Sequence, residues 1–310
     1  MSRAVADLFP AAAAGDRRAL ARAISALEVR ANGAAQALAG LPVRRMASPG
    51  SPHVIGITGP PGAGKSTFVE RILAHGRAGG KRVAVVAVDP SSPFSGGAIL
   101  GDRLRMERHG EDDGVFIRSF SARGHAGGLA RAAADVVNLF DAVGFDLVVV
   151  ETVGVGQGEL SVMEVADSVL VILTPESGDA VQAMKAGLLE IADVFCVNKA
   201  DRPGADALAR ELELSVHLDD RPGWQAPVLT ASAAENRGVE PVVTALAAHL
   251  EWCCSGGQEA WRKRRGDGRV AAWLDRVAEE ARSAAARRIA GTSVEADLRA
   301  GRSVPVGSER

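Results

Sequence analysis

The sequence predicts an α/β protein in which helices cover both faces of a mostly parallel sheet, with helical extensions at the two ends. Short runs rich in Val, Ile and Leu recur between residues 54 and 230, and most lack the polar alternation of a half-exposed strand. Between two of these runs, residues 129–140 repeat apolar side chains at helical spacing. Apolar strands that alternate with helices are typical of a doubly wound sheet.

The apolar runs give the expected strands, and the composition changes on both sides of them. The runs are 54–58, 83–88, 115–119, 147–150, 169–173, 194–197 and 228–230. Residues 1–46 are rich in Ala and Arg with helical spacing, and after Trp252 the composition changes again, with an Ala-, Arg- and Glu-rich stretch of helical spacing at residues 270–290. We therefore expect an N-terminal helical segment (1–46), a central domain (47–252) and a C-terminal helical arm (253–310). His53 precedes the first run, so we expect it to be a solvated or capping residue.

Charge and cysteine usage argue against several classes of protein. The formal net charge of the 310 residues is -2, so no strong field attracts nucleic acid or anionic lipid. Cys196, Cys253 and Cys254 lack the spacing of a zinc site and fit a reducing compartment. No apolar stretch approaches the roughly 18 residues of a membrane span. We expect a soluble cytoplasmic protein that binds neither nucleic acid nor membrane.

The strongest motif follows the first expected strand. Residues 59–67 read GPPGAGKST and match G-x-x-x-x-G-K-[ST]. The glycines let the backbone curl so that its N–H groups face phosphate oxygens, and the helix that follows adds partial positive charge. Lys65 reaches the β- and γ-phosphates, and Ser66 supplies a hydroxyl to Mg²⁺. The motif predicts a P-loop NTPase, whose phosphate-binding residues are Gly59, Gly62, Ala63, Gly64, Lys65, Ser66 and Thr67.

A second motif predicts that the nucleotide is GTP or GDP. Residues 198–201 read NKAD directly after the sixth run and resemble the N-K-x-D element of GTPases. The carboxylate of Asp201 accepts hydrogen bonds from guanine N1–H and N2–H₂, a donor pair that adenine lacks. Residues 232–233 follow the last run and resemble the GTPase element whose backbone N–H contacts guanine O6. The predicted base-reading residues are Asn198, Lys199, Asp201, Ser232 and Ala233.

Acidic residues at two other strand ends are candidates for the metal and the reaction. Residues 151–154 read ETVG and take the place of the D-x-x-G element, in which the acid holds Mg²⁺ and the Gly154 N–H contacts the γ-phosphate. Asp89 ends another strand, where its alternative role is to start a turn before proline. Asp102, in the sequence Gly101-Asp102-Arg103 that follows, is a second candidate switch carboxylate near Mg²⁺ or the attacking water. The predicted catalytic residues are Lys65, Asp89, Asp102 and Glu151, and the predicted metal ligands are Ser66, Asp89, Asp102 and Glu151.

The residue after this element predicts slow hydrolysis. Ras-like enzymes place there a Gln that orients the attacking water, whereas this chain has Val155, which cannot do so. We expect the GTPase to need help from a partner.

Together these motifs resemble the MeaB/ArgK-type GTPases, which are G-protein chaperones of adenosylcobalamin-dependent methylmalonyl-CoA mutase. The resemblance rests on GPPGAGKST (59–67), VDPSSPFSGGAILGDRLRM (88–106), ETVGVGQ (151–157) and NKAD (198–201), and covers about residues 50–250 with the flanking extensions. It implies binding of GTP with Mg²⁺, a C-terminal arm used for homodimerisation, and a role in protecting the mutase and gating its cofactor loading. It also implies a further switch that reports the nucleotide state to the mutase, with Asp179, Gln182 and Lys185 as its partner-sensing residues.

Two alternatives stay open at this point. Related GTPases deliver nickel or another metal to a different enzyme, but those relatives often carry His-rich or Cys-rich tracts. This chain has six His and no such tract. The other alternative is a non-catalytic scaffold whose bound GTP is only structural.

Overall fold

The computed structural model describes most of the expected central domain and the N-terminal helices. The described residues are 4–29, 31–42, 47–89, 112–121, 126–152, 165–176, 191–217, 223–255 and 288. The chain divides into two compact units, Met1–Lys263 and Arg264–Arg310. Beyond residue 255 the expected C-terminal arm lies almost wholly outside the described residues, and the predicted division into three segments stays a prediction.

A parallel sheet of seven strands forms the centre of the first unit, in the order β3-β2-β4-β1-β5-β6-β7. The strands are β1 (His53–Thr58), β2 (Val83–Asp89), β3 (Val115–Ser121), β4 (Leu147–Thr152), β5 (Ser168–Leu173), β6 (Val194–Val197) and β7 (Val228–Thr230). The four strands β1, β4, β5 and β6 are buried at every residue. The predicted α/β fold with a parallel sheet is therefore confirmed.

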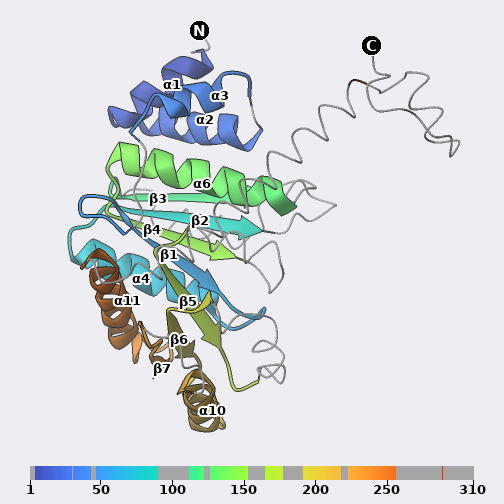
Figure 1. Cartoon of the computed structure of the whole chain (residues 1–310), viewed down its shortest axis with the longest axis vertical. Coiled ribbons are helices and arrows are strands. Elements are labelled where there is room, and N and C mark those ends of the chain that lie inside the picture. The colour runs from blue at the N-terminus through green and yellow to red at the C-terminus, as the bar shows by residue number, and fades with distance from the viewer. Residues whose placement is uncertain are drawn as a thin grey trace, which may run out of the picture. The chain divides into compact units, whose positions relative to one another are not determined.

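Helices cover both faces of this sheet (Figure 1). One face packs against α6 (Ala126–Val143) and α10 (Ala205–His217), and the other against α4 (Lys65–Ala78) and α11 (Val239–Cys254). The N-terminal helices α1 (Val5–Ala13), α2 (Arg17–Glu28) and α3 (Ala34–Ala39) pack on one another, and α1 and α2 pack against α6. Successive strand residues alternate between the two cores, as Val54 and Ile55 do, because side chains alternate across a strand. This arrangement buries both faces, which is why the strands carry no polar alternation.

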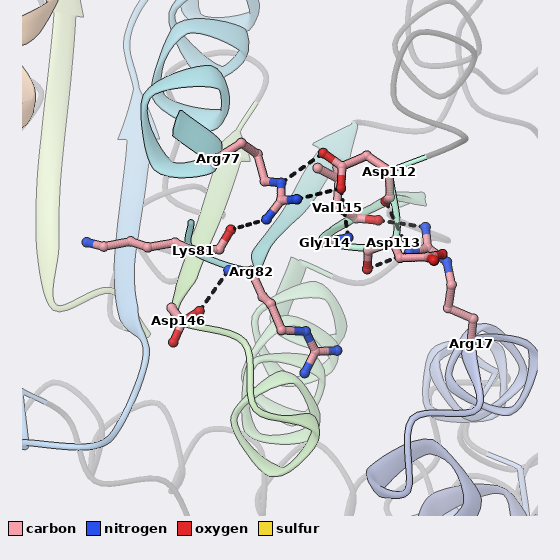
Figure 2. Close-up of polar contacts among 9 residues, drawn as sticks. All are labelled: Arg17, Arg77, Lys81, Arg82, Asp112, Asp113, Gly114, Val115 and Asp146. Carbon is pink, nitrogen blue, oxygen red and sulfur yellow. Dashed lines mark hydrogen bonds and ion pairs between the residues drawn. The ribbon is translucent and has the colours of Figure 1, made fainter. Parts of the chain in front are cut away.

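The N-terminal helices are fastened to the sheet by an arginine. Asp16 caps α2 by accepting hydrogen bonds from two backbone N–H groups of its first turn. The next residue, Arg17, donates to the carbonyls of Asp112, Asp113 and Val115 at 3.4, 3.0 and 2.6 Å, where β3 begins (Figure 2). Arg77 of α4 grips the carboxylate of Asp112 from the other side, at 2.8 and 2.7 Å. The turn before β3 is thus held by helices from both faces of the sheet.

His53 is buried in the central strand of the sheet. His53 is 8% exposed, lies within β1 and bonds Ser168 Oγ through Nε2 at 2.9 Å, so the expectation of a solvated histidine was wrong.

Within the described parts of the chain, no helix has the length and apolar character needed to span a membrane.

Candidate functional site

The predicted nucleotide motifs lie at one edge of the sheet. Parallel strands end on the same side, and the P-loop follows β1, NKAD follows β6 and residues 232–233 follow β7. Glu151 lies within β4 rather than after it, paired with Ile57 of β1 and Ala87 of β2. Ligands of doubly wound sheets bind at the carboxyl ends of the strands, so this edge is the candidate site.

The P-loop closes around the ammonium group of Lys65. This lysine begins α4, is 6% exposed, and donates from Nζ to the carbonyls of Gly59 at 2.7 Å and Pro60 at 3.0 Å. Gly64 caps the helix with φ +86, and a Cβ there would lie 2.4 Å from Asn198 Nδ2. Only glycine permits this close approach, so the P-loop and the NKAD turn pack directly on one another.

The predicted metal side of the site brings two oxygen donors together. Ser66 Oγ donates to Glu151 Oε1 at 2.5 Å, and Glu151 is 2% exposed. A hydroxyl and a carboxylate are the hard oxygen ligands that Mg²⁺ takes, usually with nucleotide phosphates and water. The Ser66 hydroxyl and the Glu151 carboxylate are therefore suitable ligands for Mg²⁺. Asp89 is the last residue of β2, the strand that pairs with β4.

Asn198 joins the three nucleotide loops. Its amide donates from Nδ2 to the carbonyl of Ala63 in the P-loop at 2.8 Å, and its Oδ1 accepts from the Ala233 N–H at 3.0 Å. The side chain is 3% exposed, so both bonds are shielded from water. The P-loop, the NKAD turn and the loop after β7 are therefore held in one buried network.

The surroundings of Asp201 favour the ionised form of its carboxyl group. A hydrogen bond from the Ser232 side chain lowers the pKa of Asp201 below its usual value, and its own backbone N–H and the charges of Arg237 and Lys199 lower it further. An ionised carboxylate accepts through both oxygens, as recognition of guanine N1–H and N2–H₂ requires.

This lowered pKa predicts how guanine affinity depends on pH. Because the folded-state pKa lies below 3.8, Asp201 stays ionised down to acid pH, and protonation would remove one acceptor only below that value. We expect GDP affinity to show no Asp201-dependent loss between about pH 8 and about pH 5. Fluorescence titration with labelled GDP across this range measures it, with Asp201→Asn as the non-titrating control. A loss centred above about pH 5 that Asp201→Asn removes would contradict the prediction.

Sequence motifs did not point to Glu176, although it contacts the base-reading loop. Its carboxylate pairs with Lys199 Nζ at 3.1 Å and with Arg202. Lys199 itself adopts φ +57, uncommon for a residue with a side chain. Glu176 carries no motif signature, because the pairing depends on how the turn after β5 meets the turn after β6.

Several predicted residues lie outside the described part of the chain. These are Asp102, Gly154, Asp179, Gln182 and Lys185. The structure does bring together Lys65, Ser66 and Glu151 on the phosphate side, and Asn198, Asp201, Ser232 and Ala233 on the base side.

Comparison with known proteins identifies the family of the chain. The family described as "Methylmalonyl Co-A mutase-associated GTPase MeaB" matches residues 20–289. A putative GTPase of Pyrococcus abyssi is 42% identical over 293 residues, covering 93% of this chain and 85% of that protein. GTPase ArgK of Escherichia coli is 43% identical over 197 residues, covering 62% of this chain and 60% of that protein. A crystal structure described as LAO/AO transport system kinase matches with a TM-score of 0.71 and 29% identity, over 95% of this chain and 89% of that one. The chain therefore belongs to the MeaB family of P-loop GTPases.

Proposed function

We propose that this chain hydrolyses GTP with Mg²⁺ and acts as a chaperone on an adenosylcobalamin-dependent acyl-CoA mutase of the methylmalonyl-CoA mutase type. The observation that carries the GTP part is the buried Asn198 bridge, which fixes the base-reading loops against the P-loop. Family membership supports the mutase part.

Each side of the site has a distinct task in this proposal. The Lys65 ammonium and the P-loop N–H groups bind the β- and γ-phosphates, where negative charge spreads during phosphoryl transfer. Ser66 and Glu151 would hold Mg²⁺, which supplies further charge neutralisation when bound. Asp201 selects guanine, because an adenine base would leave this carboxylate without donors.

Control by a partner is the second part of the proposal. Val155 stands where Ras-like enzymes carry a water-orienting Gln, so alignment of the attacking water falls to Asp89 or Asp102. We infer that basal turnover is slow and that the mutase accelerates it, with Asp179, Gln182 and Lys185 reporting the nucleotide state. The apolar spacing after residue 252 supports a C-terminal arm that pairs with a second copy in a homodimer.

A change of base preference tests the guanine assignment. Asp201→Asn is expected to weaken GTP binding and to admit xanthosine triphosphate, because the extra carbonyl of xanthine matches the new amide donor. Loss of a charge-assisted pair of hydrogen bonds is expected to lower GTP affinity by at least about 10-fold. Competition titration with GTP, ATP and xanthosine triphosphate measures the shift.

Wild-type protein gives the control for this experiment. It is expected to bind GTP and to exclude both other nucleotides. Equal affinity of the wild type for ATP and GTP would show that residues 198–201 do not read guanine.

A further inference from the structure

Arg71 is an arginine of the phosphate-binding helix that reaches the base-reading loop. It lies in α4, six residues after Lys65, and is half-buried. Its Nε donates to the carbonyl of Ala233 at 2.8 Å, and one terminal nitrogen donates to the carbonyl of Ala234 at 2.9 Å. One planar guanidinium thus holds two consecutive carbonyls, a geometry that fixes the loop more firmly than a single bond does.

The loop that Arg71 holds is the one that follows β7. Its residue Ser232 exchanges backbone hydrogen bonds with Arg237 at 2.9 and 3.1 Å, which closes a tight turn. The Ser232 side chain lowers the pKa of Asp201 by hydrogen bonding, and the Ala233 N–H donates to Asn198 Oδ1 at 3.0 Å. Movement of this loop would therefore shift both the guanine-reading carboxylate and the backbone groups beside it.

The two anchors hold this loop from different directions. Asn198 holds the Ala233 N–H from the turn after β6, whereas Arg71 holds the Ala233 carbonyl from α4. A helix rises about 1.5 Å per residue, so Arg71 stands about 9 Å along the axis from Lys65. A rigid helix of this length sets the spacing between the phosphate end and the base end of the site.

We propose that Arg71 is a positioning residue for guanine recognition. It fixes the loop of residues 232–234 at a set distance from the P-loop, so that Asp201 and the loop backbone meet the base while the phosphates are bound. Arg71 acts through the loop backbone and through Ser232. The proposal rests on guanine binding as proposed above and extends it to a residue outside the nucleotide motifs.

A comparison of GDP with inosine diphosphate tests this role. Hypoxanthine keeps O6 but lacks the 2-amino group, so it makes one hydrogen bond fewer to Asp201. Wild-type protein is expected to prefer GDP. Arg71→Ala is expected to weaken GDP binding about 10-fold and to narrow the GDP-to-IDP preference at least about threefold, because a loosened Ser232 no longer orients Asp201. Arg71→Lys has one compact donor group, so its GDP affinity and its preference for GDP over inosine diphosphate are expected to lie between those of the wild type and Arg71→Ala.

Arg77 provides a matched control on the same helix. Arg77 also donates two hydrogen bonds, but to the carboxylate of Asp112, just before β3 (Figure 2). This contact lies at the amino-terminal ends of the strands, opposite the ends that the nucleotide motifs follow. Arg77→Ala is expected to lower thermal stability while the GDP-to-IDP preference stays at the wild-type value. Calorimetric titration at a temperature where all variants are folded, checked by circular dichroism, separates stability from base recognition.

The outcomes separate this inference from the proposed function. If wild type prefers GDP to IDP and folded Arg71→Ala keeps that preference, the positioning role is overturned. If wild type binds neither GDP nor GTP, guanine binding itself fails. A narrowed preference in Arg71→Ala but not in Arg77→Ala supports the inference.

Discussion

Gly59→Ala is expected to lower the free energy of unfolding by about 2–5 kcal/mol and to abolish nucleotide binding. Gly59 adopts φ +143, and a Cβ at this position would lie 2.0 Å from the carbonyl oxygen of Ile172. Ile172 lies in the buried strand β5, paired through its neighbours with β1, so the oxygen cannot move away without disturbing the sheet. The P-loop must therefore leave its position, and the carbonyl that binds Lys65 Nζ leaves with it.

Gly62→Ala is the matched control for this substitution. Gly62 has φ +74 in the same loop, but a Cβ built there meets nothing within 4 Å. Its replacement costs only the backbone strain of a left-handed residue, about 1–2 kcal/mol. Urea denaturation of both variants measures the difference. Equal stability of Gly59→Ala and Gly62→Ala would show that the contact with β5 does not hold the P-loop.

Lys65→Ala is expected to reduce GTP turnover by about 10³-fold or more, with or without a partner. Lys65 is the only cationic side chain of residues 59–67, and its ammonium lies inside the P-loop, 2.7 Å from the Gly59 carbonyl. Removing it takes away charge stabilisation of the γ-phosphoryl group. It also leaves the carbonyls of Gly59 and Pro60 without this donor, which loosens the loop.

Lys81→Ala is the control for the change in charge. Lys81 is an exposed lysine just after α4, and its side chain points away from the polar cluster in Figure 2. Multiple-turnover phosphate release from GTP measures the turnover of both variants. Titration with labelled GDP measures the nucleotide affinity of each variant. Turnover of Lys65→Ala close to that of Lys81→Ala would contradict the assigned role.

The sheet was predictable because burial on both faces leaves a plain mark on the sequence. Strands β1, β4, β5 and β6 are buried at every residue and each carries a run of apolar residues, and the helices between them repeat apolar residues at another period. Strand ends were less well predicted. Glu151 belongs to β4, because backbone pairing continues past the last apolar residue, which composition does not reveal.

Motifs predicted the nucleotide loops but not the side chains that hold these loops in place. Arg71 and Ala233 are 162 positions apart, and Arg17 and Asp112 are 95 apart. Such pairs form only when the packing of helices on the sheet brings them together, so no local pattern marks them. The same holds for His53, which was expected to be solvated or capping because it precedes the first apolar run, although it is buried beside Ser168.

Phosphate release from GTP and from ATP, each with and without methylmalonyl-CoA mutase, tests the proposed function most directly. GTP is expected to be hydrolysed slowly by the protein alone and at least about 10-fold faster with saturating mutase, because a partner that binds the hydrolysis-competent conformation more tightly raises its population. ATP is expected to be hydrolysed under neither condition. Equal turnover of ATP and GTP, or GTP turnover that saturating mutase leaves unchanged, would contradict the proposal.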